Sequence, residues 1–360
     1  MKFPKITIAY LCALTVLSCG KDNLGQGEIK SVEIQKEIDE EEIQADEIDA
    51  GTDTESELDE ILESQKNNQE ENPSPGDTSA SVPEMGCFTK GGSAEEIGLK
   101  TWCWEDSTIP EYSNKKGVLF SDGQLKVDSE CYEKQVSVED GQIKFSLNPT
   151  YPAVEDWCSR DFNMRAEIST QPWKVNHSKG TEEWFGWSYT FGSDYIIDKS
   201  NHWLFFQVHP GVVGESPHTE LMIIKDGQIN GHNAGEIFVI NAANGKDYHP
   251  TGITPKAGET FNIVVHAVWG DTSNGLLQVW INGQSLYNKQ VATIYKAYPW
   301  GGNAKWGIYK WPWADAEAVA LSQNQGISHL ETFMGPLRMI TRKPGDLDYG
   351  KDSYALVSPN

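Results

Sequence analysis

Three short stretches of this sequence place polar side chains two or four positions apart within otherwise apolar runs. Successive side chains of an extended chain point to opposite faces, so residues two positions apart share a face. Such pairs are Asn163 and Arg165 in NMRAEIS and Gln207 and His209 in HWLFFQVHPG, and in AKWGIYKWPW an even spacing of four likewise puts Lys305 and Tyr309 on one face. Together the three faces supply a guanidinium, an amide, an imidazole, an ammonium and a phenol, a set that suits an anionic sugar polymer.

These groups fit a β-elimination at a uronic acid. The C5 proton of a uronic acid lies next to an ionised carboxylate, so an amide and a cation must neutralise that charge and stabilise the enolate-like dianion. A base then removes the proton, while an acid protonates the glycosidic oxygen on C4. His209 titrates near neutrality and can be the base, whereas Tyr309 can be the acid, or also the base where a cation favours its phenolate. The chemistry itself needs no metal.

Strict alternation also predicts what surrounds these groups. It puts Trp203 and Phe205 on the same face as Gln207 and His209. It assigns the following residues to the apolar core: Met164, Ala166, Ile168, Leu204, Phe206, Val208, Trp306 and Ile308. Gly307 is expected to leave room between the lysine and the tyrosine of its stretch.

The elements that carry these faces are expected to be strands of one all-β domain, residues 86–360. Short runs rich in β-branched and aromatic residues recur every 10 to 20 positions, separated by Gly, Asn, Asp and Pro. This spacing predicts a sandwich or barrel, and LQVWINGQSL is typical of a hairpin in a concanavalin-like jelly roll. The domain has an even number of cysteines, which favours disulfides in an exported chain: Cys87, Cys103, Cys131 and Cys158. Their pairing is left open.

The first residues have the pattern of an export signal. Lys2 and Lys5 precede an apolar run over residues 6–17, too short for a membrane span, and residues 1–18 are predicted to be a signal peptide. The four residues before Cys19 resemble the lipobox of bacterial lipoproteins, in which this cysteine is acylated. This predicts a chain held in the cell envelope by a lipid, with the domain outside the cytoplasm.

Residues 19–85 form an acidic low-complexity segment. Between Gly20 and Met85 there are 21 Asp and Glu against 4 Lys, and there is no Trp, Tyr, Phe or Cys. Such a composition cannot bury enough apolar surface to fold, which predicts a self-repelling tether. The rest of the chain is also acidic, which argues against nucleic acid as a partner. The expected partner is an anionic polysaccharide, and the chain is expected to be a monomer.

Three motifs resemble a known family. RAEIS, QVH and KWGIY are similar to the R-x-E, Q-x-H and K-x-G-x-Y signatures of jelly-roll polysaccharide lyases, which include heparin lyase I, glucuronan lyases and, more distantly, alginate lyases. They occur in the same order, and the resemblance covers most of residues 145–340. It implies that Gln207 and Arg165 bind and neutralise the substrate carboxylate, with His209 as base. It further implies that Tyr309 is the acid, or both acid and base, and that Lys305 supports the positive potential.

The chain also departs from the family pattern. It lacks the Lys and Arg clusters that sulfated heparin would call for, which favours an unsulfated polyuronate such as glucuronan or alginate. Some relatives hold a structural calcium, but no Asp-rich loop identifies one here. The alternatives on the same fold are a glycoside hydrolase that uses Glu167 and Glu220, and a glycan-binding lipoprotein without catalysis.

Further side chains beside the motifs are candidates for lining a sugar groove. Asn163 and His202 are predicted to contact substrate, and His177 and His218 also flank motif strands. Indole rings pack well on pyranose faces. The candidates for such stacking are Trp173, Trp184, Trp187, Trp311 and Trp313, of which one or two are expected to touch sugar.

Overall fold

The computed structural model describes residues 92–105, 108–109, 118–121, 123–129, 135–150 and 161–359. The predicted signal peptide, the acidic tether and the lipidation site at Cys19 lie outside the described residues, and so do Cys87, Cys131 and Cys158. The tether and the disulfide pairing therefore stay predictions. None of the helices in the described part of the chain is long and apolar enough to cross a membrane.

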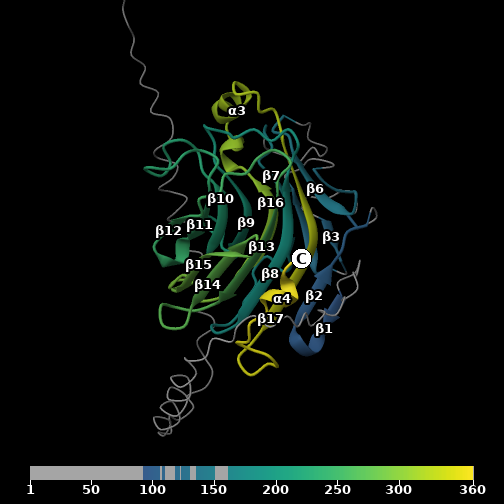
Figure 1. Cartoon of the computed structure of the whole chain (residues 1–360), viewed down its shortest axis with the longest axis vertical. Helices are drawn as coiled ribbons and strands as arrows, with labels where there is room; N and C mark the ends of the chain where they lie inside the picture. Colours follow the sequence, from purple (N-terminus) through teal and green to yellow (C-terminus); the bar gives the residue numbers. More distant parts are fainter. Residues whose placement is uncertain are drawn as a thin grey trace, which may run out of the picture. The chain divides into compact units, whose positions relative to one another are not determined.

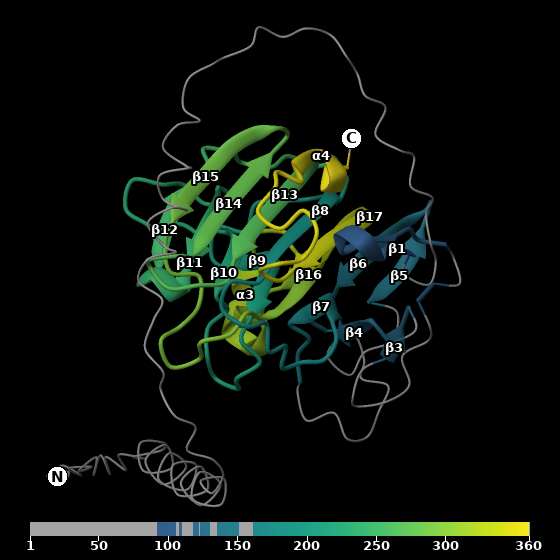
Figure 2. The same cartoon turned by 90° about the horizontal axis from the view of Figure 1, so that it is seen from below.

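The described strands form two antiparallel sheets. The first sheet has the order β1 (Gly92–Ala94), β2 (Leu99–Trp102), β17 (Leu330–Arg342), β8 (Glu182–Phe191), β13 (Thr260–Val268), β14 (Leu276–Ile281) and β15 (Gln284–Gln290). Within it, β6 (Gln142–Leu147) pairs with β17, and β5 (Val136–Glu139) pairs with β6. Figure 2 shows β17, β8, β13, β14 and β15 side by side.

The second sheet carries all three motifs. Its order is β12 (Asp247–Pro250), β11 (Ile237–Asn241), β10 (Thr219–Ile223), β9 (Trp203–His209), β16 (Asn303–Tyr309), β7 (Arg165–Thr170), β4 (Leu125–Ser129) and β3 (Val118–Phe120). Figure 1 shows β10, β9, β16 and β7 next to one another. The motif strands β7, β16 and β9 are therefore adjacent, although they are far apart in the sequence. The fold is a β-jelly-roll sandwich, as predicted.

Short helices complete the described part of the chain. They are η1 (Glu95–Ile97), η2 (Ala242–Asn244), η3 (Trp311–Ala314), α3 (Ala316–Gln323) and α4 (Tyr354–Val357). The helix α3 begins after Asp315, whose side chain accepts hydrogen bonds from the backbone N–H groups of Glu317 and Ala318. The helix η3 follows β16 directly and so places Trp311 at the end of that motif strand.

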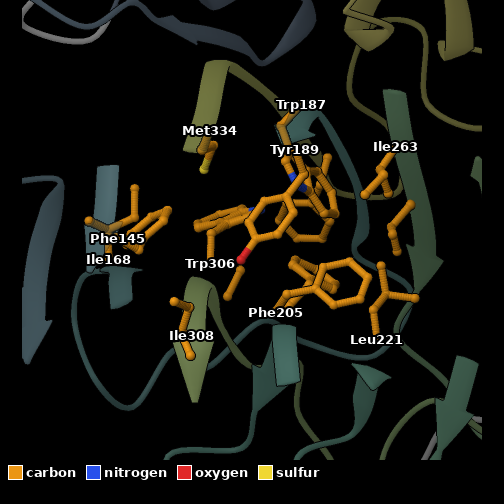
Figure 3. Close-up of a cluster of buried hydrophobic side chains, with 14 of the residues drawn as sticks. Phe145, Ile168, Trp187, Tyr189, Phe205, Leu221, Ile263, Trp306, Ile308 and Met334 are labelled. Atoms are coloured by element: carbon orange, nitrogen blue, oxygen red, sulfur yellow. The ribbon is translucent and has the colours of Figure 1, made fainter. Parts of the chain in front are cut away.

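An aromatic core fills the space between the two sheets. Alternation along β8 points Trp187 and Tyr189 inward, and the ring of Trp187 lies 4.8 Å from that of Phe206 on β9. The Tyr189 ring lies 5.2 Å from that of Phe205, and Trp306 of β16 packs in the same cluster (Figure 3). These rings bury a large apolar area, which holds the motif strands against the first sheet.

Strands β7 and β16 follow the predicted alternation. Ala166 and Ile168 on β7 and Trp306 and Ile308 on β16 are fully buried in the core cluster. The two strands also pair in a continuous register, in which Arg165 lies opposite Tyr309. Their polar residues therefore point away from the core together.

Strand β9 does not follow simple alternation. Phe206 pairs with Leu221 of β10, whereas Leu204 pairs with the next residue, Met222, so Phe205 is an extra residue in a β-bulge. Both Phe205 and Phe206 consequently point into the core.

The bulge corrects the predicted faces of β9. Trp203 and Phe205 were expected beside Gln207 and His209, but both are buried in the core cluster. The prediction for Leu204 was also wrong, because the bulge turns it out of that cluster and onto the face of Gln207. The core positions of Phe206 and Val208 are confirmed.

Gly307 is required by a close approach of two backbones. Its φ is +130°, and a Cβ atom there would lie 2.3 Å from the carbonyl oxygen of Ala166 and 2.8 Å from Cα of Glu167. The expectation that Gly307 makes room between two side chains is thus replaced by a contact with β7.

Replacing Gly307 by Ala should destabilise the domain by about 3 kcal/mol or more, because backbone strain and a clash with β7 add together. The matched control is Gly326→Ala, where φ is +84° but no atom lies within 4 Å of the added Cβ, so strain alone should cost about 1 kcal/mol. Chemical denaturation of both variants measures the difference. Equal losses would show that the contact with β7 is not what requires the glycine.

Candidate active site

A cavity of about 280 Å³ opens on the face of the second sheet that points away from the core. Five of the predicted site residues line it, namely Arg165, Gln207, His209, Lys305 and Tyr309. They come from the three adjacent strands β7, β9 and β16. Trp173 and Trp311 also line the cavity, as do residues of the loop between β9 and β10.

The strand register arranges these side chains in two rows. In one row, Tyr309 of β16 lies between Arg165 of β7 and Leu204 of β9. In the other, Gln207 of β9 lies between Lys305 of β16 and Glu220 of β10. Positions of this kind on regular strands are more precisely held than positions on loops.

The two cations of the cavity share one carboxylate. Lys305 Nζ donates to Asp128 Oδ2 at 2.7 Å, and Arg165 Nη1 lies 3.4 Å from the same oxygen. Burial acts to raise the pKa of Asp128, but the charges of Lys305, Arg165 and Lys126 outweigh burial and hold it well below its usual range. Asp128 is therefore ionised, and it fixes both cations beneath the cavity.

Aromatic rings orient the same two cations. The guanidinium of Arg165 lies 4.4 Å from the centroid of the Tyr309 ring, and Lys305 Nζ lies 4.7 Å from that of Trp173. A guanidinium against this ring favours the negative charge that develops on the phenol oxygen when it releases its proton. The contact thus links the predicted carboxylate-binding residue to the predicted acid.

Gln207 is held by a buried carboxyl group. Its Nε2 donates to Glu167 Oε1 at 2.7 Å, and Arg165 Nε lies 3.5 Å from Glu167 Oε2. Glu167 is 1% exposed, and burial raises its pKa although Lys305 and Arg165 act against the rise. Glu167 does not line the cavity, so it positions Gln207 and Arg165. The two carboxylates that a hydrolase would need, Glu167 and Glu220, are not brought together in the cavity.

His209 is neutral and bound to backbone on both sides of its ring. Its Nδ1 accepts from the N–H of Gly211 at 3.0 Å, so Nε2 carries the hydrogen and donates to the carbonyl oxygen of Glu215 at 2.9 Å. Burial and the charge of Lys305 lower its pKa to about 4. The ring stacks on Trp173 at 4.7 Å. It can accept a proton only after Nδ1 is released from the N–H of Gly211.

Two predicted substrate contacts are not brought to the cavity. Asn163 is fully buried, where its amide exchanges hydrogen bonds with Gln135 and donates to the carbonyl oxygen of Asn148. His202 packs its ring 4.2 Å from Trp311, and burial lowers its pKa to about 4. Asn163 therefore fastens the start of β7, and His202 supports an indole that does line the cavity.

The remaining predicted Trp and His candidates also divide into residues that line the cavity and residues that do not. Trp173 and Trp311 line the cavity, whereas Trp184, Trp187 and Trp313 are buried. His218 is fully buried and its Nε2 lies 3.0 Å from the carbonyl oxygen of Trp300. His177 pairs with Glu183 at 3.1 Å, away from the cavity.

Glu220 is a cavity residue that the motifs did not single out for a lyase. It is 7% exposed, and burial raises its pKa to about 7 against the charge of Lys246. Alternation along TELMI places it on the face opposite the core residue Leu221, so the pattern contained the signal. Without the strand pairing, nothing in the sequence places it beside Gln207.

Replacing Glu220 by Gln should stabilise the protein above neutral pH. Between the ordinary pKa of 4.5 and the folded value of about 7, the unfolded chain loses this proton while the folded chain keeps it. The free energy of unfolding therefore falls as pH rises through this range, by up to about 3 kcal/mol. Denaturation at pH 8 should show the variant more stable by about that amount, and at pH 4 the two proteins should be nearly equal. An equal difference at both pH values would contradict the buried titration.

A possible metal-ligand group lies elsewhere. Asp194, His329 and Glu331 bring ligand-type atoms within 4.8 Å of one another. His329 Nε2 lies 2.9 Å from Asp194 Oδ2, and the ammonium of Lys144 already pairs with Glu331 at 3.1 Å. The described side chains of this group thus contact one another and Lys144, and the calcium that the resemblance allows stays a prediction.

The chain is similar to one known family and to several solved structures. A family model described as polysaccharide lyase matches residues 112–330. An endo-β-1,4-glucuronan lyase from the fungus Trichoderma reesei is similar at 15% identity, covering 69% of this chain and 97% of that chain, with a TM-score of 0.41. Alginate lyase A1-II′, a member of polysaccharide lyase family 7, is similar at 13% identity, covering 61% and 95%, with a TM-score of 0.41. A polysaccharide lyase of family 18, aly-SJ02, is similar at 13% identity, covering 62% and 96%, with a TM-score of 0.43. No curated protein matches.

Proposed function

The chain belongs to the polysaccharide lyase family, and on that premise we propose that its cavity cleaves a uronic-acid-containing polysaccharide by β-elimination. The product would be a 4,5-unsaturated uronyl end. One observation carries the proposal. Arg165, Gln207, His209, Lys305 and Tyr309 come from three adjacent strands and line a single cavity.

Arg165, Lys305 and Gln207 would receive the substrate carboxylate. Both cations are already held in place by Asp128, and Gln207 is held by Glu167. Groups that are fixed before substrate arrives stabilise a developing dianion without having to reorganise. This pre-organisation is what the acidity of C5 requires, and it needs no metal.

Tyr309 would perform both proton transfers. As the phenolate it takes the C5 proton, the electron pair of that C–H bond forms the C4=C5 double bond, and the C4–O4 bond breaks. The phenol then returns the proton to O4 of the leaving sugar, which restores the phenolate, so atoms and charge balance. The cation on its ring supports the charged form.

His209 would then act as a neutral positioning group, whose hydrogen bonds hold Gly211 and Glu215 of the loop after β9 and whose ring stacks on Trp173. It was expected to be the base, but both ring nitrogens are bonded to backbone and its pKa is lowered to about 4. A role as base would first require release of the bond from the Gly211 N–H, because Nδ1 holds the electron pair that would take the proton. Tyr309 is the simpler assignment for the base, and the two assignments predict different variants to be inactive.

Export and lipidation complete the proposal. The signal-like residues 1–18, the lipobox before Cys19 and the acidic segment 19–85 support a chain tethered to the envelope membrane, with the enzyme domain held away from the lipid. Replacing Cys19 by Ala should move the full chain from the membrane fraction to the soluble fraction after cell lysis. Unchanged membrane retention would contradict the lipid anchor.

The proposed reaction is tested by incubating the protein with unsulfated and sulfated polyuronates. A C4=C5 double bond next to a carboxylate absorbs in the ultraviolet, and we expect this absorbance to rise with at least one polymer. New reducing ends without that absorbance would indicate hydrolysis, and binding without any cleavage would indicate a glycan-binding protein.

A further inference from the structure

Charge changes sign across the cavity. The row through Gln207 has Lys305 on one side and Glu220 on the other, two strand spacings or about 10 Å apart along the backbone. Glu215, which is exposed at the rim, is near the same side chain as Glu220, because both carboxylates add to burial in raising the pKa of Tyr295. One side of the cavity is therefore cationic and the other is acidic.

The cationic side carries little excess charge. Among the described residues that line the cavity, Arg165 and Lys305 are the cations, while Glu215 and Glu220 are acids. Asp128 pairs with both cations from below. The positive charge that remains suits one carboxylate better than a row of them.

Glu220 is built into the acidic side rather than lying on the surface. It is 7% exposed, and in the part of the chain that the structure describes no hydrogen-bond or ion-pair partner contacts its carboxyl group. Burial raises its pKa to about 7 against the charge of Lys246, and burial together with the charge of Glu220 raises the pKa of Tyr248 and of Tyr295. A buried carboxyl group that faces a cavity and lacks a partner is a candidate to meet a ligand.

The cationic side and the acidic side of the cavity favour the binding of different sugars. In a homopolymer of uronic acid, every sugar brings a carboxylate, and the one beside Glu220 would meet a like charge. A sugar without a carboxylate instead brings hydroxyl or amide donors, which a carboxylate accepts in strong hydrogen bonds. Building on the proposed function, we propose that the substrate is a heteropolysaccharide in which the cleaved uronic acid neighbours a sugar without a carboxylate, and that Glu220 selects this neighbour.

The test compares unsulfated polymers at equal uronate concentration with the full chain at pH 8. The polymers are glucuronan, polymannuronate and an alternating polymer of glucuronic acid and N-acetylglucosamine. We expect kcat/KM for the alternating polymer to exceed that for either homopolymer by about tenfold or more. Glu220→Gln keeps the shape of the side chain and removes its charge, so it should raise kcat/KM for glucuronan. The ratio of kcat/KM for the alternating polymer to kcat/KM for glucuronan should fall by about threefold or more.

Glu96→Gln is the matched control. Glu96 is exposed on the short helix η1, between strands β1 and β2 of the first sheet, so this substitution should leave the ratio of the two kcat/KM values unchanged. Glucuronan cleaved as fast as the alternating polymer would overturn the inference while leaving the lyase reaction intact. A folded Glu220→Gln variant with an unchanged ratio would also overturn it. If no polymer gains the double bond, the proposed function itself fails, and this inference fails with it.

Discussion

Replacing Tyr309 by Phe is expected to lower kcat by a factor of about 10³ or more. The variant loses the one oxygen that the mechanism uses both to take the C5 proton and to return it to O4. The ring stays, so its contact with the Arg165 guanidinium and its packing beside Trp311 remain. The free energy of unfolding should change by only about 1 kcal/mol, the typical effect of one hydroxyl group. Initial rates and a denaturation curve measure the two effects separately.

Two further variants make this result specific. Tyr354→Phe removes a hydroxyl from α4, away from the cavity, and should keep full activity. His209→Gln should keep more activity than Tyr309→Phe, because an amide can replace a neutral hydrogen-bonding group but not a base. If His209→Gln lost all activity while Tyr309→Phe kept substantial activity, His209 rather than Tyr309 would be the base.

Replacing Gln207 by Leu is expected to lower kcat by about 10² to 10³, the usual effect of removing one donor to a developing oxyanion. The side chain volume is nearly kept, so packing against its neighbours changes little. The variant should also be less stable by about 1–3 kcal/mol, because Glu167 loses a donor while it stays buried.

Steady-state kinetics at saturating and limiting substrate separates two explanations for Gln207. A loss in kcat means that the amide acts on the dianion, as proposed. A rise in KM with kcat unchanged would mean that it only binds substrate, and would contradict its role in stabilising the charge. Asn163→Leu is a useful comparison, because that amide is also buried and hydrogen-bonded but does not line the cavity.

Alternation predicted most of the site because two motif strands are regular. Arg165 on β7 and Tyr309 on β16 pair in register, so their faces agree with a simple period of two. Strand β9 broke the rule at Phe205, since one extra residue reverses the faces before it and leaves those after it unchanged. Gln207 and His209 follow the bulge, so their shared face was predicted correctly, while the faces of Trp203 and Phe205 were not.

Other parts of the site depend on pairings that a single sequence does not contain. Asp128 lies on β4, and only the position of β4 beside β7 brings it beneath Lys305 and Arg165. Glu220 reaches the cavity because β10 pairs with β9, and the backbone partners of His209 come from the loop between those strands. Such long-range contacts decide which polar residues share a cavity, and they also decide that Asn163 does not reach it.

The mass of the products tests most directly whether this cavity cleaves by elimination rather than by hydrolysis. A defined uronate oligosaccharide should be cleaved into two fragments whose masses add up to the mass of the substrate, with the new non-reducing end carrying the C4=C5 double bond. The Tyr309→Phe variant should produce neither fragment. Fragments whose masses exceed the substrate by one water, with no double bond, would contradict the account.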